Sequence, residues 1–193
     1  HDLRTPLTRL KLQLAMLDQK EISKKMSGDI DEMEKMLNDY LQFAKTQIKE
    51  NSAKVNINEF FKEIINDLDT KNLHLTTNKD ELTLVVRKNL FKRCINNLIS
   101  NGLTYGKNVY INLKSSSNLL TINIEDHGPG IDEEQYKNVF KPFFRLDRSR
   151  SLNKSGVGLG LSIAEDVINS HGGNIKLSRS KYNGLLVRVT LPF

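Results

Sequence analysis

Apolar residues in the first 50 positions recur at alternating spacings of four and three. The first run comprises Leu3, Leu7, Leu10, Leu14 and Leu17, and the second comprises Ile30, Met33, Leu37, Tyr40 or Leu41, Ala44 and Ile48. This rhythm is typical of the seam of a coiled coil or a four-helix bundle. Because polar residues over 18–28 separate the runs, residues 1–50 are predicted to form a helical hairpin. Two helices cannot bury such stripes completely on each other, so a second copy of the chain is predicted to complete a four-helix bundle and make a homodimer.

The periodicity changes after residue 52. Helical patterns cover 58–68, 88–105 and 159–170, and strand patterns cover 73–76, 82–86, 109–113, 119–124, 174–178 and 185–191. Polar residues over 115–118 indicate a hairpin turn. The predicted fold class is α+β, with a helical hairpin over 1–50, a linker over 51–54, and helices stacked on one mixed sheet over 55–193.

Composition excludes several classes of protein. The 193 residues are 38% hydrophobic and 27% charged, as in a soluble globular protein, and the longest apolar runs are far shorter than the roughly 20 residues that span a bilayer. Cys94 stands alone, which excludes an internal disulfide, and is interpreted as a small buried hydrophobe. The net charge of +6 is spread over 29 basic and 23 acidic residues, so nucleic acid is not expected as a partner.

The amino end carries a candidate phosphate acceptor. His1 and Thr5 are four residues apart and share one helical face, and Pro6 is expected to bend the helix just past His1. Neutral imidazole is a nucleophile at physiological pH, and the Asp2 carboxylate beside it would fix its tautomer. Thr5 would position a water for the reverse, hydrolytic step. A His–Asp pair is commonplace on helices, but here the apolar seam continues directly from it.

Asp126 is the candidate for recognition of a base. It stands at the end of the strand predicted over 119–124 and is followed by Gly128 and Gly130. A carboxylate at this position can accept a hydrogen bond from an exocyclic amine, and the glycines let the backbone approach a flat ring. This arrangement indicates adenine.

The helix predicted over 88–105 carries three further candidates. Asn97 and Asn101 are four residues apart, so that both amides face one way. Amide oxygens suit Mg²⁺, which keeps waters and phosphate oxygens as its other ligands, and Asn97 is the expected metal ligand. Tyr105, one turn further on, would flank the base or ribose.

The phosphates are expected at a glycine cluster formed by Gly156, Val157, Gly158, Leu159, Gly160 and Leu161. Backbone N–H groups and a helix N-terminus there would bind anions, although a run of glycines alone is more often a turn. The preceding residues 140–145 combine phenylalanines with Lys141 and Arg145, as expected of a lid that neutralises a triphosphate. The alternatives are a solvated loop and ordinary core phenylalanines. The cluster is neither a Walker A motif nor a dinucleotide fingerprint.

Taken together, these motifs resemble those of bacterial sensor histidine kinases of the EnvZ type. Residues 1–8 resemble the H box of that family, 97–105 the N box, 126–130 the G1 box, 140–145 the F box and 156–161 the G2 box. Two positions depart from the pattern. Thr104 stands where the family commonly has Lys or Arg, and Val157 replaces a frequent Thr or Ser.

The resemblance implies a fold and an activity. The second domain would share the fold of Hsp90, gyrase and MutL and bind ATP with Mg²⁺. His1 would be phosphorylated by a membrane-bound homodimer and pass its phosphate to an aspartate in the receiver domain of a response regulator, which the protein would also dephosphorylate. The chain is expected to be the cytoplasmic piece of a bacterial inner-membrane protein, attached through segments upstream of His1. The alternative is a nucleotide-gated dimeric interaction module that transfers no phosphate.

Overall fold

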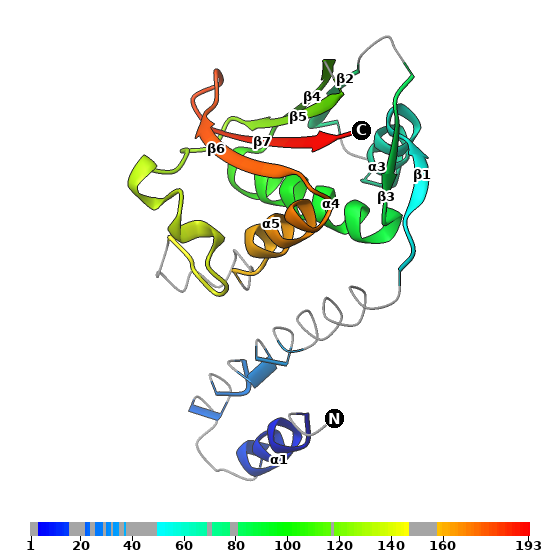
Figure 1. The fold of residues 1–193 in the computed structure, drawn as a ribbon. Coiled ribbons are helices and arrows are strands. Elements are labelled where there is room, and N and C mark those ends of the chain that lie inside the picture. Colours follow the sequence, from blue (N-terminus) through cyan, green and yellow to red (C-terminus); the bar gives the residue numbers. More distant parts are fainter. Residues whose placement is uncertain are drawn as a thin grey trace. The chain divides into compact units, whose positions relative to one another are not determined.

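The structure, a computed structural model, describes residues 4–15, 22–23, 26–28, 30–31, 33–34, 37, 50–68, 71–77, 81–116, 118–146 and 158–193 (Figure 1). The chain divides into two compact units, His1–Ile48 and Lys49–Phe193. None of the helices in the described residues is both long and apolar enough to pass through a membrane.

The first unit is helical where it is described. Helix α1 spans Arg4–Ala15, and its Leu7 and Leu14 are buried with Ile30 in a core against which Leu37 packs. These four residues belong to the two predicted stripes, and their shared core agrees with a hairpin. Apolar side chains that stay about half exposed in the single chain are Leu10, Leu12, Ile22, Met26 and Met33.

The second unit is built on a five-stranded sheet in the order β2-β4-β5-β7-β6. Its strands are β2 (Leu73–Thr76), β4 (Val109–Ser116), β5 (Leu119–Asp126), β6 (Asn174–Arg179) and β7 (Leu185–Pro192). β2 pairs with β4 in parallel, and the other neighbours are antiparallel. The predicted mixed sheet and the hairpin turn between β4 and β5 are confirmed.

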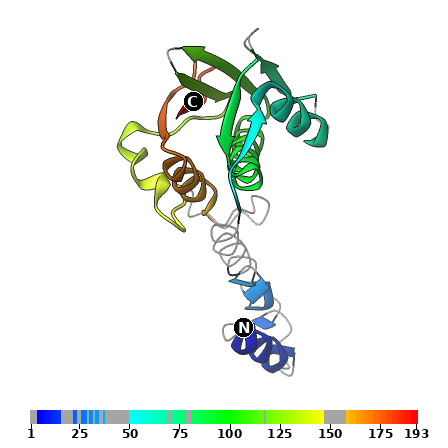
Figure 2. The same ribbon diagram turned by 45° about the vertical axis from the view of Figure 1, so that its right-hand side comes forward.

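Helices cover one face of this sheet. α4 (Lys88–Gly106) and α5 (Gly160–Ser170) pack on each other and against the sheet, while α3 (Ile57–Leu68) adjoins α4 through Phe60, which stacks on Phe91 at 5.1 Å (Figure 1). Alternation along the strands supplies the apolar face: Val109, Ile111 and Leu113 are buried beneath the helices. Within the described residues of the second unit, no helix covers the opposite face (Figure 2).

One predicted strand belongs elsewhere. β3 (Thr83–Val86) was expected in the main sheet but pairs antiparallel with β1 (Ala53–Asn56) in a separate two-stranded sheet. β1 itself was not predicted, because Val55 is its only buried residue and the segment is too short to show alternation. It takes in residues 53 and 54 of the expected linker. Two short 3₁₀ turns, η1 (Glu133–Gln135) and η2 (Asn138–Phe140), follow β5.

The start of α4 is capped from a distance. The N-cap residue Arg87 provides no side-chain cap. Instead, the Glu50 carboxylate accepts hydrogen bonds from the backbone N–H of Asn89 at 2.6 Å and of Leu90 at 3.0 Å. A negative charge at a helix N-terminus satisfies free N–H groups and complements the helix dipole. The first described residue of the second unit is thus bonded to the helix that carries Asn97.

Cys94 lies on the buried side of α4. Its Sγ is 3.7 Å from the carbonyl oxygen of Ala164 on α5, and burial raises the pKa of the thiol to about 12. The interpretation of Cys94 as a buried hydrophobe is confirmed.

His171, just past α5, is held as a neutral imidazole. Its Nε2 accepts a hydrogen bond from the Arg87 backbone N–H at 3.0 Å, so Nδ1 carries the proton and donates to the Val167 carbonyl at 2.7 Å. Burial is the main cause that lowers the pKa of His171, with the Arg87 charge adding to it, while the bond to Val167 and the Glu50 charge oppose it. The unfolded chain therefore takes up a second proton on this imidazole more readily than the folded chain does.

The stability that neutral His171 provides is present above the usual imidazole pKa of about 6.5 and is lost as the pH falls below it toward the lower folded-state pKa. We expect the free energy of unfolding, measured by urea titration, to fall between about pH 7.5 and about pH 5.5, and the fall to be smaller in His171→Gln. An equal pH dependence in both proteins would contradict this assignment.

Candidate nucleotide-binding site

Asp126 is fixed at the end of β5 by one of its two carboxylate oxygens. The side chain is 7% exposed, and Oδ1 accepts hydrogen bonds from the backbone N–H of Gly128 at 2.7 Å and of Leu185 at 3.1 Å. Among the described residues, Oδ2 receives no hydrogen bond from the chain. The carboxylate is thus oriented by the backbone and keeps one oxygen for a ligand.

Glycines surround this carboxylate because no side chain fits. A Cβ on Gly106 would lie 2.6 Å from the Asp126 Cβ, and one on Gly128 would lie 2.9 Å from its Oδ1. A Cβ on Gly184 would collide with both the carbonyl oxygen and Oδ1 of Asp126. Gly130 has a φ of +74° and lies beside the Gly184 carbonyl. The end of α4, the loop after β5 and the start of β7 therefore meet at Asp126.

Three predicted residues lie along one side of α4. A Cβ on Gly160, the first residue of α5, would lie 3.4 Å from the Asn101 Nδ2 and 3.9 Å from the Asn97 Cβ. Asn97 and Asn101 are half-buried, and Tyr105 is 47% exposed one turn further on, next to the loop at Gly128. The amides of α4 thus lie beside the start of α5, and Tyr105 lies beside the Asp126 loop.

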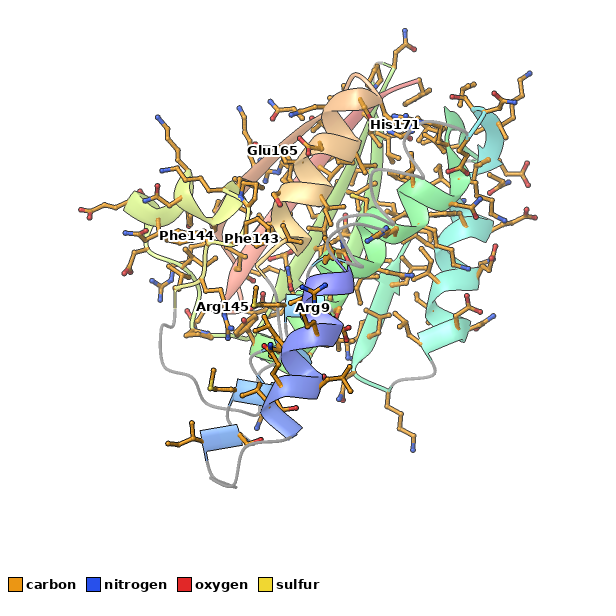
Figure 3. The ribbon with its side chains drawn as sticks, turned by 90° about the horizontal axis from the view of Figure 1, so that it is seen from below. Arg9, Phe143, Phe144, Arg145, Glu165 and His171 are labelled. Carbon is orange, nitrogen blue, oxygen red and sulfur yellow. The ribbon has the colours of Figure 1, made fainter. Side chains whose placement is uncertain are left out.

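A backbone hydrogen bond joins Phe143 to Gly158, two residues before α5. The Phe143 backbone N–H donates to the Gly158 carbonyl at 3.0 Å, and both residues have positive φ, +64° and +75°. A Cβ on Gly158 would lie 2.8 Å from the Phe144 carbonyl oxygen. Phe143, Phe144 and Arg145 lie at the end of α5 where the helix begins, and His171 lies at its other end (Figure 3). Residues 143 and 158 are therefore fixed to each other at the start of α5.

The first turn of α5 has no side-chain cap. Its N-cap residue, the buried Leu159, makes no side-chain hydrogen bond to it, so among the described residues the N–H groups of Gly160 and Leu161 are not capped by that side chain. Such a helix end binds anions. Lys141 is exposed and donates to the Asn138 side chain at 2.7 Å, and Arg145 is half-buried.

Not every predicted residue is placed by the structure. His1, Asp2, Gly156 and Val157 lie outside the described residues, and Thr5 is described only as part of the α1 backbone. Thr104, one of the two positions expected to depart from the motif pattern, is exposed, and its hydroxyl donates to the Ser100 carbonyl at 2.7 Å. The described residues contain no cluster of three or more His, Cys, Asp or Glu side chains that would hold a metal ion.

Sequence reasoning missed the turn between β6 and β7. Asn183-Gly184 is a dipeptide that signals a turn, and Asn183 indeed has a φ of +68°. Nothing in the local pattern showed that Gly184 and Leu185 would contact Asp126, because the two segments are far apart in the sequence.

Comparison with known proteins identifies the family of this chain. A model of the histidine kinase-, DNA gyrase B- and HSP90-like ATPases matches residues 71–193, and a model of the His Kinase A (phospho-acceptor) domain matches residues 1–47. The sensor histidine kinase GtrS of Pseudomonas aeruginosa is 33% identical over the whole chain, which spans 40% of GtrS. The chain belongs to the histidine kinase-, DNA gyrase B- and HSP90-like ATPases and, within them, to the two-component sensor histidine kinases of the EnvZ type.

Two solved structures resemble the fold. The histidine kinase domain of the Escherichia coli osmosensor EnvZ has a TM-score of 0.58 and 26% identity, covering 75% of this chain and 90% of that one. Full-length ShkA in complex with AMPPNP has a TM-score of 0.74 and 18% identity, covering all of this chain and 44% of ShkA. The predicted fold class is confirmed.

Proposed function

We propose that this chain is the catalytic core of a sensor kinase that transfers the γ-phosphoryl group of ATP to His1. The observation that carries the proposal is the Asp126 carboxylate, which is oriented by two backbone N–H groups while Oδ2 is left for an exocyclic amine. Residues 1–50 act as the dimerisation and phosphoacceptor domain, 51–54 as the linker, and 55–193 as the ATP-binding domain. The ATPase family and the AMPPNP bound by ShkA support ATP as the nucleotide.

The nucleotide contacts follow from the positions around Asp126. Adenine binds at Asp126 between the backbone of Gly128 and Gly130 and the ring of Tyr105. The phosphates bind at the start of α5, where the N–H groups of residues 156–161 and the helix dipole attract anions. Lys141 and Arg145 add positive charge, which neutralises the phosphates as the lid closes.

The amide side chains of α4 fit a magnesium ion. Asn97 and Asn101 are half-buried beside Gly160, where the phosphates bind, and hard amide oxygens suit Mg²⁺. Asn97 is the proposed ligand, and the bound ion would offset phosphate charge during transfer. Asn101, whose amide lies nearest Gly160, is proposed to contact the phosphates.

The transfer itself is a substitution at phosphorus. Nε2 of His1 attacks the γ-phosphorus, the new N–P bond forms as the bond to the bridging oxygen breaks, and ADP leaves with that oxygen. Asp2 keeps the proton on Nδ1 and stabilises the charge that develops on the ring. The ATP-binding domain contributes mainly the positioning of the nucleotide and the neutralisation of its phosphate charge.

The helical unit is proposed to bind the protein partners. The half-exposed Leu10, Ile22, Met26 and Met33 provide apolar surface for a second copy, and the phospho-acceptor domain that matches residues 1–47 supports a homodimer. A response-regulator receiver domain accepts the phosphate from His1, and Thr5 positions a water when that regulator is dephosphorylated. The whole protein is proposed to be a bacterial inner-membrane protein, with this chain on the cytoplasmic side.

The proposal is tested with the full-length kinase, γ-labelled Mg-ATP and a panel of receiver domains. We expect label that is stable to alkali and labile to acid, as a phosphohistidine is, followed by transfer to one receiver. Nucleotide binding without any acid-labile label would instead support the interaction module that transfers no phosphate.

A further inference from the structure

Glu125 and Asp126 at the end of β5, and His127 just after it, each contact the turn between β6 and β7 or the residue that follows that turn. The Glu125 carboxylate accepts hydrogen bonds from the Ser180 hydroxyl at 3.1 Å and the Lys181 N–H at 3.3 Å. Asp126 Oδ1 accepts from Leu185, just past the turn, and the His127 ring stacks on Tyr182 with centroids 4.8 Å apart. The turn over 180–184, together with Leu185, therefore contacts Asp126 and both of its neighbours in the sequence, Glu125 and His127.

The contact with His127 is part of a larger stack of rings. Tyr182 also stacks on Tyr110 at 4.2 Å, Tyr110 stacks on His127 at 5.4 Å, and His74 stacks on the Tyr110 ring at 4.7 Å. The ring planes lie within 21° to 26° of each other. Tyr110 and His74 belong to alternate strand positions whose side chains lie on the sheet face away from α4 and α5. Stacked rings of this kind add stability beyond that of the area they bury.

The turn itself is closed by its own backbone. Ser180 N–H donates to the Gly184 carbonyl at 2.9 Å, and Asn183 N–H donates to the Ser180 carbonyl at 3.0 Å. The absence of space for a Cβ at Gly184 means that its backbone lies directly against Asp126. A displacement of this turn would therefore be transmitted to the carboxylate.

We propose that Tyr182 is a positioning residue for adenine recognition: by stacking on His127 and Tyr110 it holds the β6–β7 turn against Asp126 and so fixes the carboxylate for the exocyclic amine. The inference rests on the proposed role of Asp126 in binding that amine. It assigns part of the base selectivity to a side chain on the opposite face of the sheet from the helices that line the site.

The test compares ADP with IDP, which carries a keto oxygen in place of the exocyclic amine. Affinities of the full chain for Mg-ADP and Mg-IDP are measured by displacement of a fluorescent adenine nucleotide. Tyr182→Leu is expected to lower the affinity for ADP about tenfold while that for IDP stays nearly constant, so the preference for ADP falls about tenfold. Tyr182→Phe keeps the ring and is expected to retain the preference.

Two further variants make the test specific. His127→Leu removes the same stacking contact from the other side and is expected to reduce the preference similarly, which keeps the test available if Tyr182→Leu does not fold. His74→Leu removes a ring that contacts Tyr110 but not the turn, and is expected to change the preference by less than about twofold.

The outcomes distinguish a failure of the positioning role of Tyr182 from a failure of the role of Asp126 in binding adenine. An unchanged preference in Tyr182→Leu, or an equal loss of both nucleotides, would overturn the positioning role, because general destabilisation weakens both alike. A wild-type chain that binds ADP and IDP equally would overturn the role of Asp126 and this inference with it.

Discussion

Asp126→Asn is expected to weaken the binding of Mg-ATP at least about 100-fold, because a charge-assisted hydrogen bond to the adenine amine is lost and an amide donor faces another donor. Asparagine has the same shape, and its Oδ1 can still accept from Gly128 and Leu185. The fold is therefore expected to survive. Isothermal titration calorimetry of the full chain measures the affinity, and urea unfolding checks the stability.

The matched control is Asp166→Asn. Asp166 is exposed on α5. Its substitution by Asn removes the same formal charge from the same domain, so an effect of net charge alone would appear in both variants. We expect the control to bind Mg-ATP within about twofold of wild type, as surface charges contribute little. Near-wild-type affinity in Asp126→Asn would show that the base binds elsewhere.

Gly158→Ala is expected to lower the affinity for Mg-ATP and the initial rate of autophosphorylation at least about 30-fold. The left-handed conformation costs an alanine about 1–2 kcal/mol, and the collision of its Cβ with the Phe144 carbonyl adds to that cost. The backbone has to shift where residues 143 and 158 are joined, and the start of α5 shifts with it. Nucleotide titration and rate measurements at low ATP concentration check this result.

Gly172→Ala separates strain from collision. Gly172 has nearly the same φ, +73°, but the nearest atom to its added Cβ is a side-chain carbon of Pro192 at 3.7 Å. This control is expected to lose stability in urea by about 1–2 kcal/mol while binding ATP normally. If both variants bound nucleotide equally well, the contact between residues 143 and 158 would have no part in the site.

The fold could be predicted wherever a segment carries its own periodicity. α4 was predicted over 88–105 and spans Lys88–Gly106, because its apolar residues keep a helical spacing through five turns. β3 shows why the remainder was not predicted: its alternation identifies a strand but not the partner, which is a four-residue strand with one buried residue. Pairing between short strands depends on tertiary packing, which local pattern does not contain.

Some residues of the candidate site could be predicted from the sequence, and others could not. Asp126, Asn97 and the glycines before α5 stand in short motifs whose chemistry is visible in order along the chain. Gly184 and Tyr182 act through contacts with a strand about 60 residues away, and a tyrosine in a polar turn indicates no function by itself. Glu50 is a similar case, since its capping of α4 joins residues 39 and 40 positions apart.

In the proposed reaction, a nucleotide bound at Asp126 delivers its γ-phosphoryl group to His1. The full-length kinase and its His1→Gln and Asp126→Asn variants are each incubated with Mg-ATP. The phosphorylated residue is then located by mass spectrometry under neutral conditions. We expect phosphohistidine at His1 in the wild type, none in His1→Gln and a severely reduced amount in Asp126→Asn at low ATP. Undiminished acid-labile phosphate in His1→Gln would contradict this reaction.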